Sequence, residues 1–252
     1  MIEIFILSFI QGVTEFIPVS SSSHLILMSN LLDFENQSLS IDVSLHIGSL
    51  LAVLVYFYKE IINFFNNKEL FKKIFVSSLP VIIVGYLLVQ FNLIEELRNI
   101  KIIGWTTLIF GILLYISDKF KLKKSIDKDF DYKSAILIGI FQILSLIPGV
   151  SRSGISMTAA RFLNFNRFDS AKLAFLLSIP TLGAVTVFGV NNLIVSDNLN
   201  LSQLNIFSII LSFFISIITI KYFLKFIKKF DLIIFVIYRI LLGLFLLFMS
   251  YL

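Results

Sequence analysis

Residues 11–24 read QGVTEFIPVSSSSH, and this polar stretch interrupts a segment that is apolar on both sides. Pro18 cannot continue an α-helix, because its ring removes a backbone donor and clashes with the preceding turn. The serines that follow, Ser20 to Ser23, favour turns and the first residues of helices. The stretch therefore predicts a helix that breaks and restarts within residues 2–29.

A second stretch repeats this pattern. Residues 147–154 read IPGVSRSG and interrupt the apolar segment 134–163, and IPGVS at 147–151 resembles IPVS at 17–20 with one residue inserted. We interpret each broken segment as a re-entrant helical hairpin that enters the membrane, breaks and returns to the same side. Irregular backbone of this kind is tolerated at membrane depth only inside the protein or beside a wet cavity.

The composition predicts an integral membrane protein. The chain is 58% hydrophobic, its mean hydropathy is +0.95, and it contains 28 phenylalanines, which is more apolar surface than a soluble domain can bury. Long apolar runs separated by short charged loops indicate helices rather than the alternating strands of a barrel. Six runs approach the ~20 residues that a span requires. They are 41–58, 74–91, 102–117, 173–190, 205–222 and 232–251.

The fold class is therefore all-α, with six transmembrane helices and two re-entrant hairpins in a single membrane domain, residues 1–252. There is no cysteine, which excludes disulfides and thiolate metal sites. The first nine residues, MIEIFILSF, lack a basic segment, so we expect no cleaved signal peptide.

The basic residues predict the topology. Of the 21 Lys and Arg, 17 lie in the loops 59–73, 118–133, 161–172 and 221–231. The loops expected on the opposite side carry only Arg98 and Lys101. Because cytoplasmic loops are enriched in Lys and Arg, the four basic loops are expected inside the cell. The net charge of +5 then marks topology and does not indicate nucleic-acid binding.

The topology also predicts an internal repeat. Each half, 1–117 and 134–252, contains one broken segment followed by three spans, and the basic cytoplasmic loop 118–133 joins them. Three is an odd number, so the second half is inverted relative to the first, as in many secondary transporters. The two breaks should then enter from opposite faces and meet.

The first break contains groups that are costly to bury in a membrane. Gln11 and Glu15 are four residues apart and share one helix face. The Glu15 carboxylate must face a partner, a metal or water. His24 titrates near neutral pH, which suits proton transfer. Free N–H groups at the restarted helix, together with the serine hydroxyls, favour an anion.

The second break adds a permanent charge. The Arg152 guanidinium matches phosphate oxygens, and Gly149 and Gly154 allow the backbone to approach closely. Together the breaks predict a phosphate or diphosphate cradle formed by Ser20, Ser22, Ser151, Arg152, Ser153, Gly154 and Ser156. Glu15 with Gln11 would hold a hard divalent cation, Mg²⁺ or Ca²⁺, which prefers oxygen ligands.

Less specific interpretations apply to several of these residues. Serine and glycine in membrane helices often serve packing alone. His46, at the start of a span, is more typical of a membrane interface than of catalysis, and Arg239 in the last span is more typical of a structural role than of a functional one. The repeat also suits a transporter or flippase for a phosphorylated lipid. A purely structural protein does not account for Glu15 or Arg152.

The segments QGVTEFIPVSSSSHLIL and LIPGVSRSGISMTAARF resemble the two signatures of the bacterial undecaprenyl-diphosphate phosphatase family, also called the bacitracin-resistance protein family. The resemblance extends over DVSLHIGSLLAVLVYF, AKLAFLLSIPTLGA and IYRILLG, and so over nearly the whole chain. It implies an integral membrane phosphatase of the bacterial plasma (inner) membrane, with its active site open to the outer (periplasmic) face. That activity recycles the lipid carrier of peptidoglycan synthesis and confers bacitracin resistance.

The resemblance also implies roles for individual residues. Ser21 would be the nucleophile, Arg152 the phosphate clamp and His24 the proton-transfer residue, while Glu15 with Gln11 would bind the cation or position the nucleophile. The family usually has Ser-Ser-Thr-Gly-His where this chain has serines before His24, so which serine attacks stays open. A phosphoserine intermediate and a metal-activated water are the two mechanisms to separate.

The partners expected from these observations are an isoprenoid diphosphate lipid as substrate and the surrounding membrane lipids, with no nucleic acid. A homodimer is the quaternary state to test.

Overall fold

The computed structural model describes residues 1–32, 34, 38–64, 68–91, 93, 97–120, 124–195 and 202–251. These residues are largely helical, and β-structure within them is confined to one isolated bridge. Six helices are long and apolar enough to cross a membrane. They are α3 (Leu39–Tyr56), α5 (Lys68–Gln90), α6 (Ile100–Asp118), α10 (Arg167–Val195), α11 (Gln203–Ile227) and α12 (Ile233–Tyr251). The predicted all-α, multi-pass membrane fold is confirmed.

The predicted spans differ from these helices mainly at their ends. The span predicted at 41–58 extends two residues past α3, because the helix ends before Phe57 (φ −98°, ψ 24°), where the short helix α4 (Tyr58–Asn63) begins. Helix α10 is longer than predicted, since its charged first turn continues the helix beyond the apolar run. Within the predicted basic loops 59–73 and 118–133, residues 65–67 and 121–123 lie outside the described residues.

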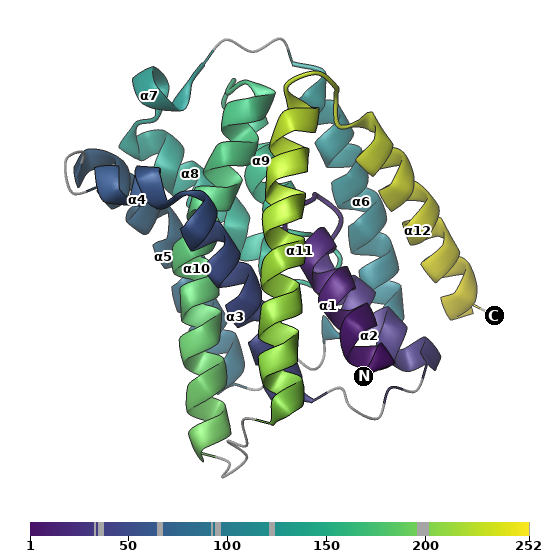
Figure 1. Ribbon diagram of the computed structural model, residues 1–252. Helices are drawn as coiled ribbons and strands as arrows, with labels where there is room; N and C mark the ends of the chain where they lie inside the picture. Colours follow the sequence, from purple (N-terminus) through teal and green to yellow (C-terminus); the bar gives the residue numbers. More distant parts are fainter. Residues whose placement is uncertain are drawn as a thin grey trace.

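Each predicted break separates two helices. The first lies between α1 (Ile2–Thr14) and α2 (Ser21–Leu32). The second follows α8 (Tyr132–Ile143) and the 3₁₀ turn η2 (Leu144–Leu146), and it precedes α9 (Arg152–Phe162). In Figure 1, α1 and α2 occupy the lower half of the molecule and α8 and α9 the upper half, with the short helix α7 (Ile126–Asp129) at the top.

Helix pairing agrees with the arrangement that an inverted repeat requires. Helix α1 packs against α11, and α8 packs against α5, which are the corresponding elements of the two halves. Re-entry of the hairpins into a membrane, and the two-fold relation itself, stay predictions.

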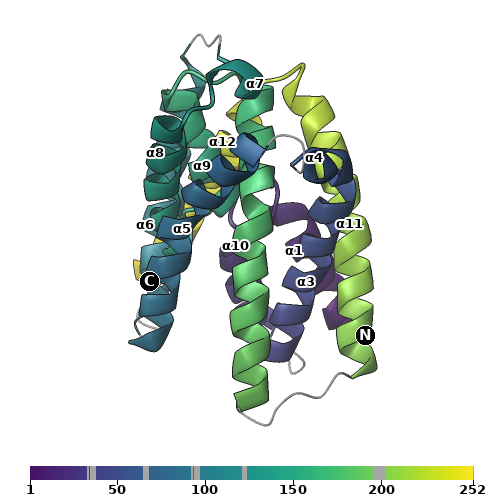
Figure 2. The ribbon, with the colours of Figure 1, turned by 90° about the vertical axis from the view of Figure 1, so that its left-hand side faces the viewer.

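Helix α10 runs through the middle of the molecule, with α5 and α3 packed against it (Figure 2). The fully buried Phe16 of the first break meets Phe175 of α10 edge-on, with ring centroids 5.4 Å apart. One apolar core therefore holds the first break against the central helix, and it fixes where polar residues on α10 lie.

Candidate active site

The two breaks meet at one cavity of about 360 Å³. Its walls are mostly apolar side chains from α5 and α10. Its polar lining comes from both breaks, from α3 and from α10, and it consists of Glu15, Ser20, Ser21, Ser22, His46, Ser145, Ser151, Arg152, Thr181 and Asn192. Segments more than a hundred residues apart thus share one polar pocket, as the sequence predicts.

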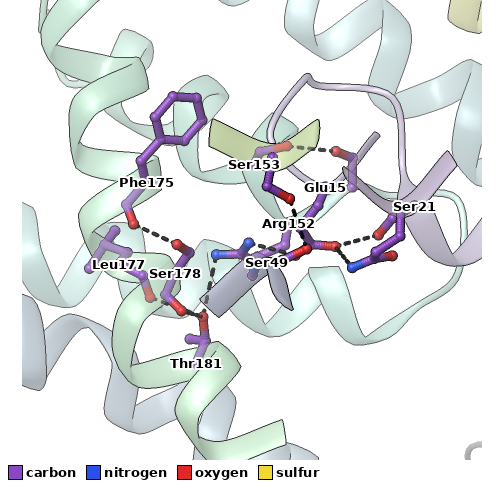
Figure 3. Close-up of polar contacts among 12 residues, drawn as sticks. Glu15, Ser21, Ser49, Arg152, Ser153, Phe175, Leu177, Ser178 and Thr181 are labelled. Atoms are coloured by element: carbon purple, nitrogen blue, oxygen red, sulfur yellow. Dashed lines mark hydrogen bonds and ion pairs between the residues drawn. The ribbon is translucent and has the colours of Figure 1, made fainter. Parts of the chain in front are cut away.

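The Glu15 carboxylate links the two breaks. Its Oε1 forms an ion pair with Nη2 of Arg152 at 2.7 Å, and its Oε2 accepts hydrogen bonds from Ser21 Oγ at 2.6 Å and Gln11 Nε2 at 3.0 Å (Figure 3). The side chain is only 6% exposed. A buried carboxylate requires such partners, and here both of its oxygens have them.

Ser21 is the serine of the row whose hydroxyl contacts a base. It is the first residue of α2, and its hydroxyl donates to the Glu15 carboxylate. The Ser20 hydroxyl instead pairs with those of Ser23 at 3.0 Å and Ser22 at 3.3 Å. A hydroxyl hydrogen-bonded to a carboxylate is the usual arrangement of an activated oxygen nucleophile. The geometry therefore favours Ser21, the serine that the resemblance implies.

The residue before each restarted helix has a positive φ, 79° at Ser20 and 72° at Ser151. This conformation is uncommon for residues other than glycine, and such strained residues often lie at functional sites. The Ser151 hydroxyl also caps α9 by accepting a hydrogen bond from the Gly154 N–H at 3.2 Å. Gly149 adopts φ 95°, and a Cβ there would collide with the Thr106 side chain.

Arg152 is held from two sides. Besides Glu15, its guanidinium donates through Nη1 to Thr181 Oγ1 at 3.4 Å (Figure 3). Thr181, which the sequence interpretation missed, directly follows Pro180, the proline inside α10. A polar residue next to a proline within a predicted span is the signal that would have pointed to it. The arginine that should bind phosphate is thus anchored to the central helix.

Arg239 of α12 ties the breaks together and does not line the cavity. It is fully buried and donates to the carbonyls of Pro18 at 3.2 Å, Val150 at 3.1 Å and Gly149 at 2.8 Å, as well as to a carbonyl of α6. A Cβ at Gly154 would lie 3.0 Å from its Nη1. The close approach expected at Gly154 is therefore to Arg239, and Gly154 is not a lining residue.

His24 does not line the cavity. One ring nitrogen, Nδ1, lies 2.6 Å from the Ser20 carbonyl oxygen, and Nε2 lies 2.6 Å from the Tyr238 hydroxyl. The two rings stack with centroids 5.7 Å apart and an interplanar angle of 12°. Both nitrogens are engaged with the protein, so His24 supports the strained Ser20 from behind. Its predicted role in proton transfer stays a prediction.

Two predicted phosphate-binding serines of α9 also point elsewhere. The Ser153 hydroxyl donates to the Ile17 carbonyl at 2.9 Å and so binds α9 to the first break. Ser156 is buried, and its hydroxyl has no hydrogen-bond partner among the described residues. Since a helix turns 100° per residue, serines at 151, 153 and 156 cannot all face one cavity. Ser151 and Arg152 do line it.

His46 lies in the cavity lining, although its position at a span end favoured an interfacial role. Its Nδ1 lies 2.8 Å from the Asp42 carbonyl one turn earlier, which fixes that nitrogen as the donor. Hydropathy and charge could not indicate that α3 would bring this end to the breaks, because the packing of α3 against α10 is a tertiary contact.

A cation would find few ligands here from the protein alone. The described residues contain no group of three or more His, Cys, Asp or Glu that could hold a metal. The Gln11 Oε1 atom, however, is buried without a hydrogen-bond partner in the described structure. Gln11 is fully buried and does not line the cavity, and its amide nitrogen faces Glu15. Its orphaned oxygen suits a hard cation that takes its remaining ligands from phosphate oxygens and water.

Comparison with known proteins identifies the family of this chain. Residues 4–245 match the family described as "Bacitracin resistance protein BacA". An undecaprenyl-diphosphatase of Pelagibacter ubique (strain HTCC1062) is 48% identical over 252 residues, covering 100% of this chain and 98% of the relative. An undecaprenyl-diphosphatase of Jannaschia sp. (strain CCS1) is 37% identical, covering 100% of this chain and 99% of the relative. One of Saccharophagus degradans is 40% identical, covering 94% of this chain and 93% of the relative. The chain therefore belongs to the bacitracin resistance protein BacA family.

Proposed function

We propose that this protein is an integral membrane phosphatase that hydrolyses undecaprenyl diphosphate to undecaprenyl phosphate and inorganic phosphate. The observation that carries the proposal is the contact of Glu15 with both Ser21 and Arg152. The Ser21 hydroxyl donates a hydrogen bond to the Glu15 carboxylate, which also pairs with the Arg152 guanidinium, and all three line one cavity. Each of the relatives compared above is named an undecaprenyl-diphosphatase. The activity would recycle the lipid carrier for peptidoglycan and confer bacitracin resistance.

The chemistry follows from these three side chains. Arg152 binds the terminal phosphate and offsets charge that develops on its oxygens. Glu15 accepts the proton of Ser21 as its Oγ attacks the terminal phosphorus. The bond from that phosphorus to the bridging oxygen breaks, and undecaprenyl phosphate leaves. Water then hydrolyses the phosphoserine, releases inorganic phosphate and restores the serine.

A divalent cation, Mg²⁺ or Ca²⁺, is part of this proposal. Glu15 and Gln11 would be its protein ligands, and it would neutralise charge on the diphosphate. Gln11 and Ser21 both donate to the same Glu15 oxygen, so the carboxylate also orients the nucleophile in the absence of any cation.

The isoprenoid tail would lie along the apolar walls of the cavity. These walls come from α5 and α10 and include Val81, Ile82 and Gly85 on the first helix and Val185 and Phe188 on the second. Apolar burial is non-directional, so these walls can hold a tail of any length, and a tail longer than the cavity gains no further burial energy there. We therefore expect shorter isoprenoid diphosphates to be accepted.

We place the protein in the bacterial plasma membrane with its site open to the outer face, on the strength of the Lys and Arg distribution. The natural absence of cysteine gives a direct test. A cysteine introduced as Asn191→Cys should react with an impermeant maleimide on intact cells, and one introduced as Lys128→Cys should react only after permeabilisation. The reverse pattern would invert the topology. A homodimer is proposed too, and light scattering of the purified protein tests it.

The decisive experiment is phosphate release from an isoprenoid diphosphate by the purified protein in detergent. We expect release that EDTA abolishes, that added Mg²⁺ restores, and that Ser21→Ala and Arg152→Ala eliminate. Trapping of a phosphoserine at Ser21 would establish the covalent step, whereas activity of Ser21→Ala would favour a metal-activated water.

A folding control makes the result interpretable. Each variant is compared with the parent by thermal unfolding and size-exclusion profile. If the well-folded parent released no phosphate, the enzyme would be excluded, and lipid transport, which the predicted inverted repeat suits, would become the leading function.

A further inference from the structure

A second cavity, of about 480 Å³, lies where α6 and α11 end and α10 begins, near the top of Figure 1. It is separate from the active-site cavity and shares no lining residue with it. Five basic residues and one acidic residue line it: Lys119, Arg161, Arg167, Lys228, Lys229 and Asp118. The proposed phosphatase activity uses none of these residues.

The single carboxylate of this lining is fully occupied. Asp118 accepts from Arg167 Nε at 2.7 Å and Nη2 at 3.0 Å, forms an ion pair with Arg161 at 3.1 Å and accepts from the Leu232 N–H at 3.1 Å. Asp231, at the start of α12, interacts electrostatically with Arg167. Even when both carboxylates are counted against the five cations, the cavity carries an excess of three positive charges.

One of the cations is preorganised and incompletely satisfied. The Arg161 side chain is 3% exposed, and its two terminal nitrogens donate to the carbonyls of Phe165, Asp118 and Phe120. Its Nε is buried and has no hydrogen-bond partner among the residues that the structure describes. A buried guanidinium N–H without an acceptor is costly, so this group favours a ligand that supplies an acceptor oxygen.

The lysines remain available to a ligand. Lys228 Nζ lies 4.4 Å from the Phe168 ring centroid and Lys119 Nζ lies 4.7 Å from that of Tyr115, and these ring contacts leave the ammonium protons free to be donated. Phe230, at the rim, is 56% exposed. The cavity thus combines arginines held by Asp118 with exposed lysines and an apolar edge, at the level of the helix ends.

We propose that this cavity binds a phosphate group. Guanidinium and ammonium donors around an uncompensated positive charge suit a phosphate better than a carboxylate, since phosphate offers more acceptor oxygens and more charge. Two sources share this chemistry: the headgroup of an anionic phospholipid and free inorganic phosphate. Basic pockets at the ends of membrane helices bind lipid headgroups in this way. The proposal does not depend on the phosphatase activity.

The test is a thermal-unfolding titration of the full-length, detergent-purified protein. Its three arms contain dioctanoyl phosphatidylglycerol, dioctanoyl phosphatidylcholine and inorganic phosphate. The variant Lys228→Gln/Lys229→Gln removes two of the three exposed lysines of the lining and leaves the buried Arg161–Asp118 contacts intact. We expect the anionic lipid or phosphate to raise the Tm, and the variant to need about tenfold more of that ligand for half of the effect. The matched control is Lys221→Gln/Lys225→Gln, which makes the same charge change on α11 at residues outside the cavity lining.

The three ligands distinguish a lipid headgroup from free phosphate, and Arg152→Ala distinguishes this cavity from the active site. A shift with phosphatidylglycerol alone assigns the cavity to a lipid headgroup, and a shift with inorganic phosphate assigns it to the free ion. In either case the shift must persist in Arg152→Ala, which distinguishes this cavity from the active site. Equal weakening in the two lysine double variants, no effect of either ligand, or loss of the shift in Arg152→Ala would overturn the proposal.

Discussion

Ser20 and Ser151 both have a positive φ, 79° and 72°, and each directly precedes the helix that restarts after its break. Both residues line the active-site cavity. The conformation turns the chain sharply, so that the next residue, Ser21 in one break and Arg152 in the other, begins a helix at the cavity. The two residues proposed to carry nucleophile and phosphate binding thus occupy equivalent positions.

Two substitutions of Ser151 separate the energetic cost of its positive φ from the contribution of its capping hydrogen bond. In Ser151→Gly the positive φ is retained without steric cost, and the hydroxyl's contacts with the Gly154 N–H and the Ser153 hydroxyl are lost. In Ser151→Ala the cap is lost and the strain stays. We expect the alanine variant to be destabilised by ~1 kcal/mol and the glycine variant by a few tenths. Unfolding in a denaturing detergent measures both, and equal losses would contradict this account.

Replacement of Arg152 by lysine should be almost as damaging as its removal. A single ammonium cannot hold Glu15 and Thr181 and also present a planar pair of donors to phosphate. We expect kcat/KM of Arg152→Lys to fall about a hundredfold. Steady-state phosphate release provides the measurement, with Lys172→Arg, a conservative change away from the cavity, as the control. Activity within threefold of the parent would show that charge alone suffices.

His24→Asn tests whether His24 acts by position or by proton transfer. The asparagine amide can donate to the Ser20 carbonyl in place of Nδ1, but it cannot titrate. If support of Ser20 is the role, His24→Asn should retain activity within about tenfold of the parent and His24→Ala should lose more. The pH–rate profile decides between the roles: disappearance of a limb near neutral pH in the asparagine variant would restore proton transfer to His24.

Arg239→Met should mainly affect stability. The methionine fills much of the space but leaves the carbonyls of Pro18, Gly149 and Val150 without their donor inside the protein. Charge-assisted hydrogen bonds of this kind predict a loss of ~3 kcal/mol or more. Thermal unfolding would show it. Arg239→Lys keeps the charge and some of the donors, so its stability should lie between those of the parent and the methionine variant. A methionine variant as stable as the parent would show that Arg239 does not hold the two breaks together.

Gln11→Glu tests the proposed cation. A second carboxylate beside Glu15 would strengthen binding of a hard divalent ion, because affinity rises with ligand charge. We expect the Mg²⁺ concentration for half-maximal phosphate release to fall roughly tenfold. Gln11→Leu should raise it. If neither change moves the Mg²⁺ dependence, the cation is held by the substrate without Gln11.

Hydropathy and proline spacing predicted the six spans and both breaks, since each is a local property of the chain. The Gln11–Glu15 contact was also predictable, because a helix brings residues four apart together. The positions of Thr181 and His46 were not, since they depend on how α10 and α3 pack against the breaks. Ser153 and Ser156 do not line the cavity, because their spacing on α9 places them on other helix faces, and phosphate binding by them stays a prediction.

The guanidinium of Arg239 imposes an order on biosynthesis. The ribosome makes the first break well before α12, whose Arg239 donates to the Pro18 carbonyl 221 residues away along the chain. Until α12 is in place, the carbonyls of Pro18, Gly149 and Val150 lack this partner. Both breaks are therefore completed only after α12 has been made, and a nascent chain truncated before α12 lacks the side chain that joins them.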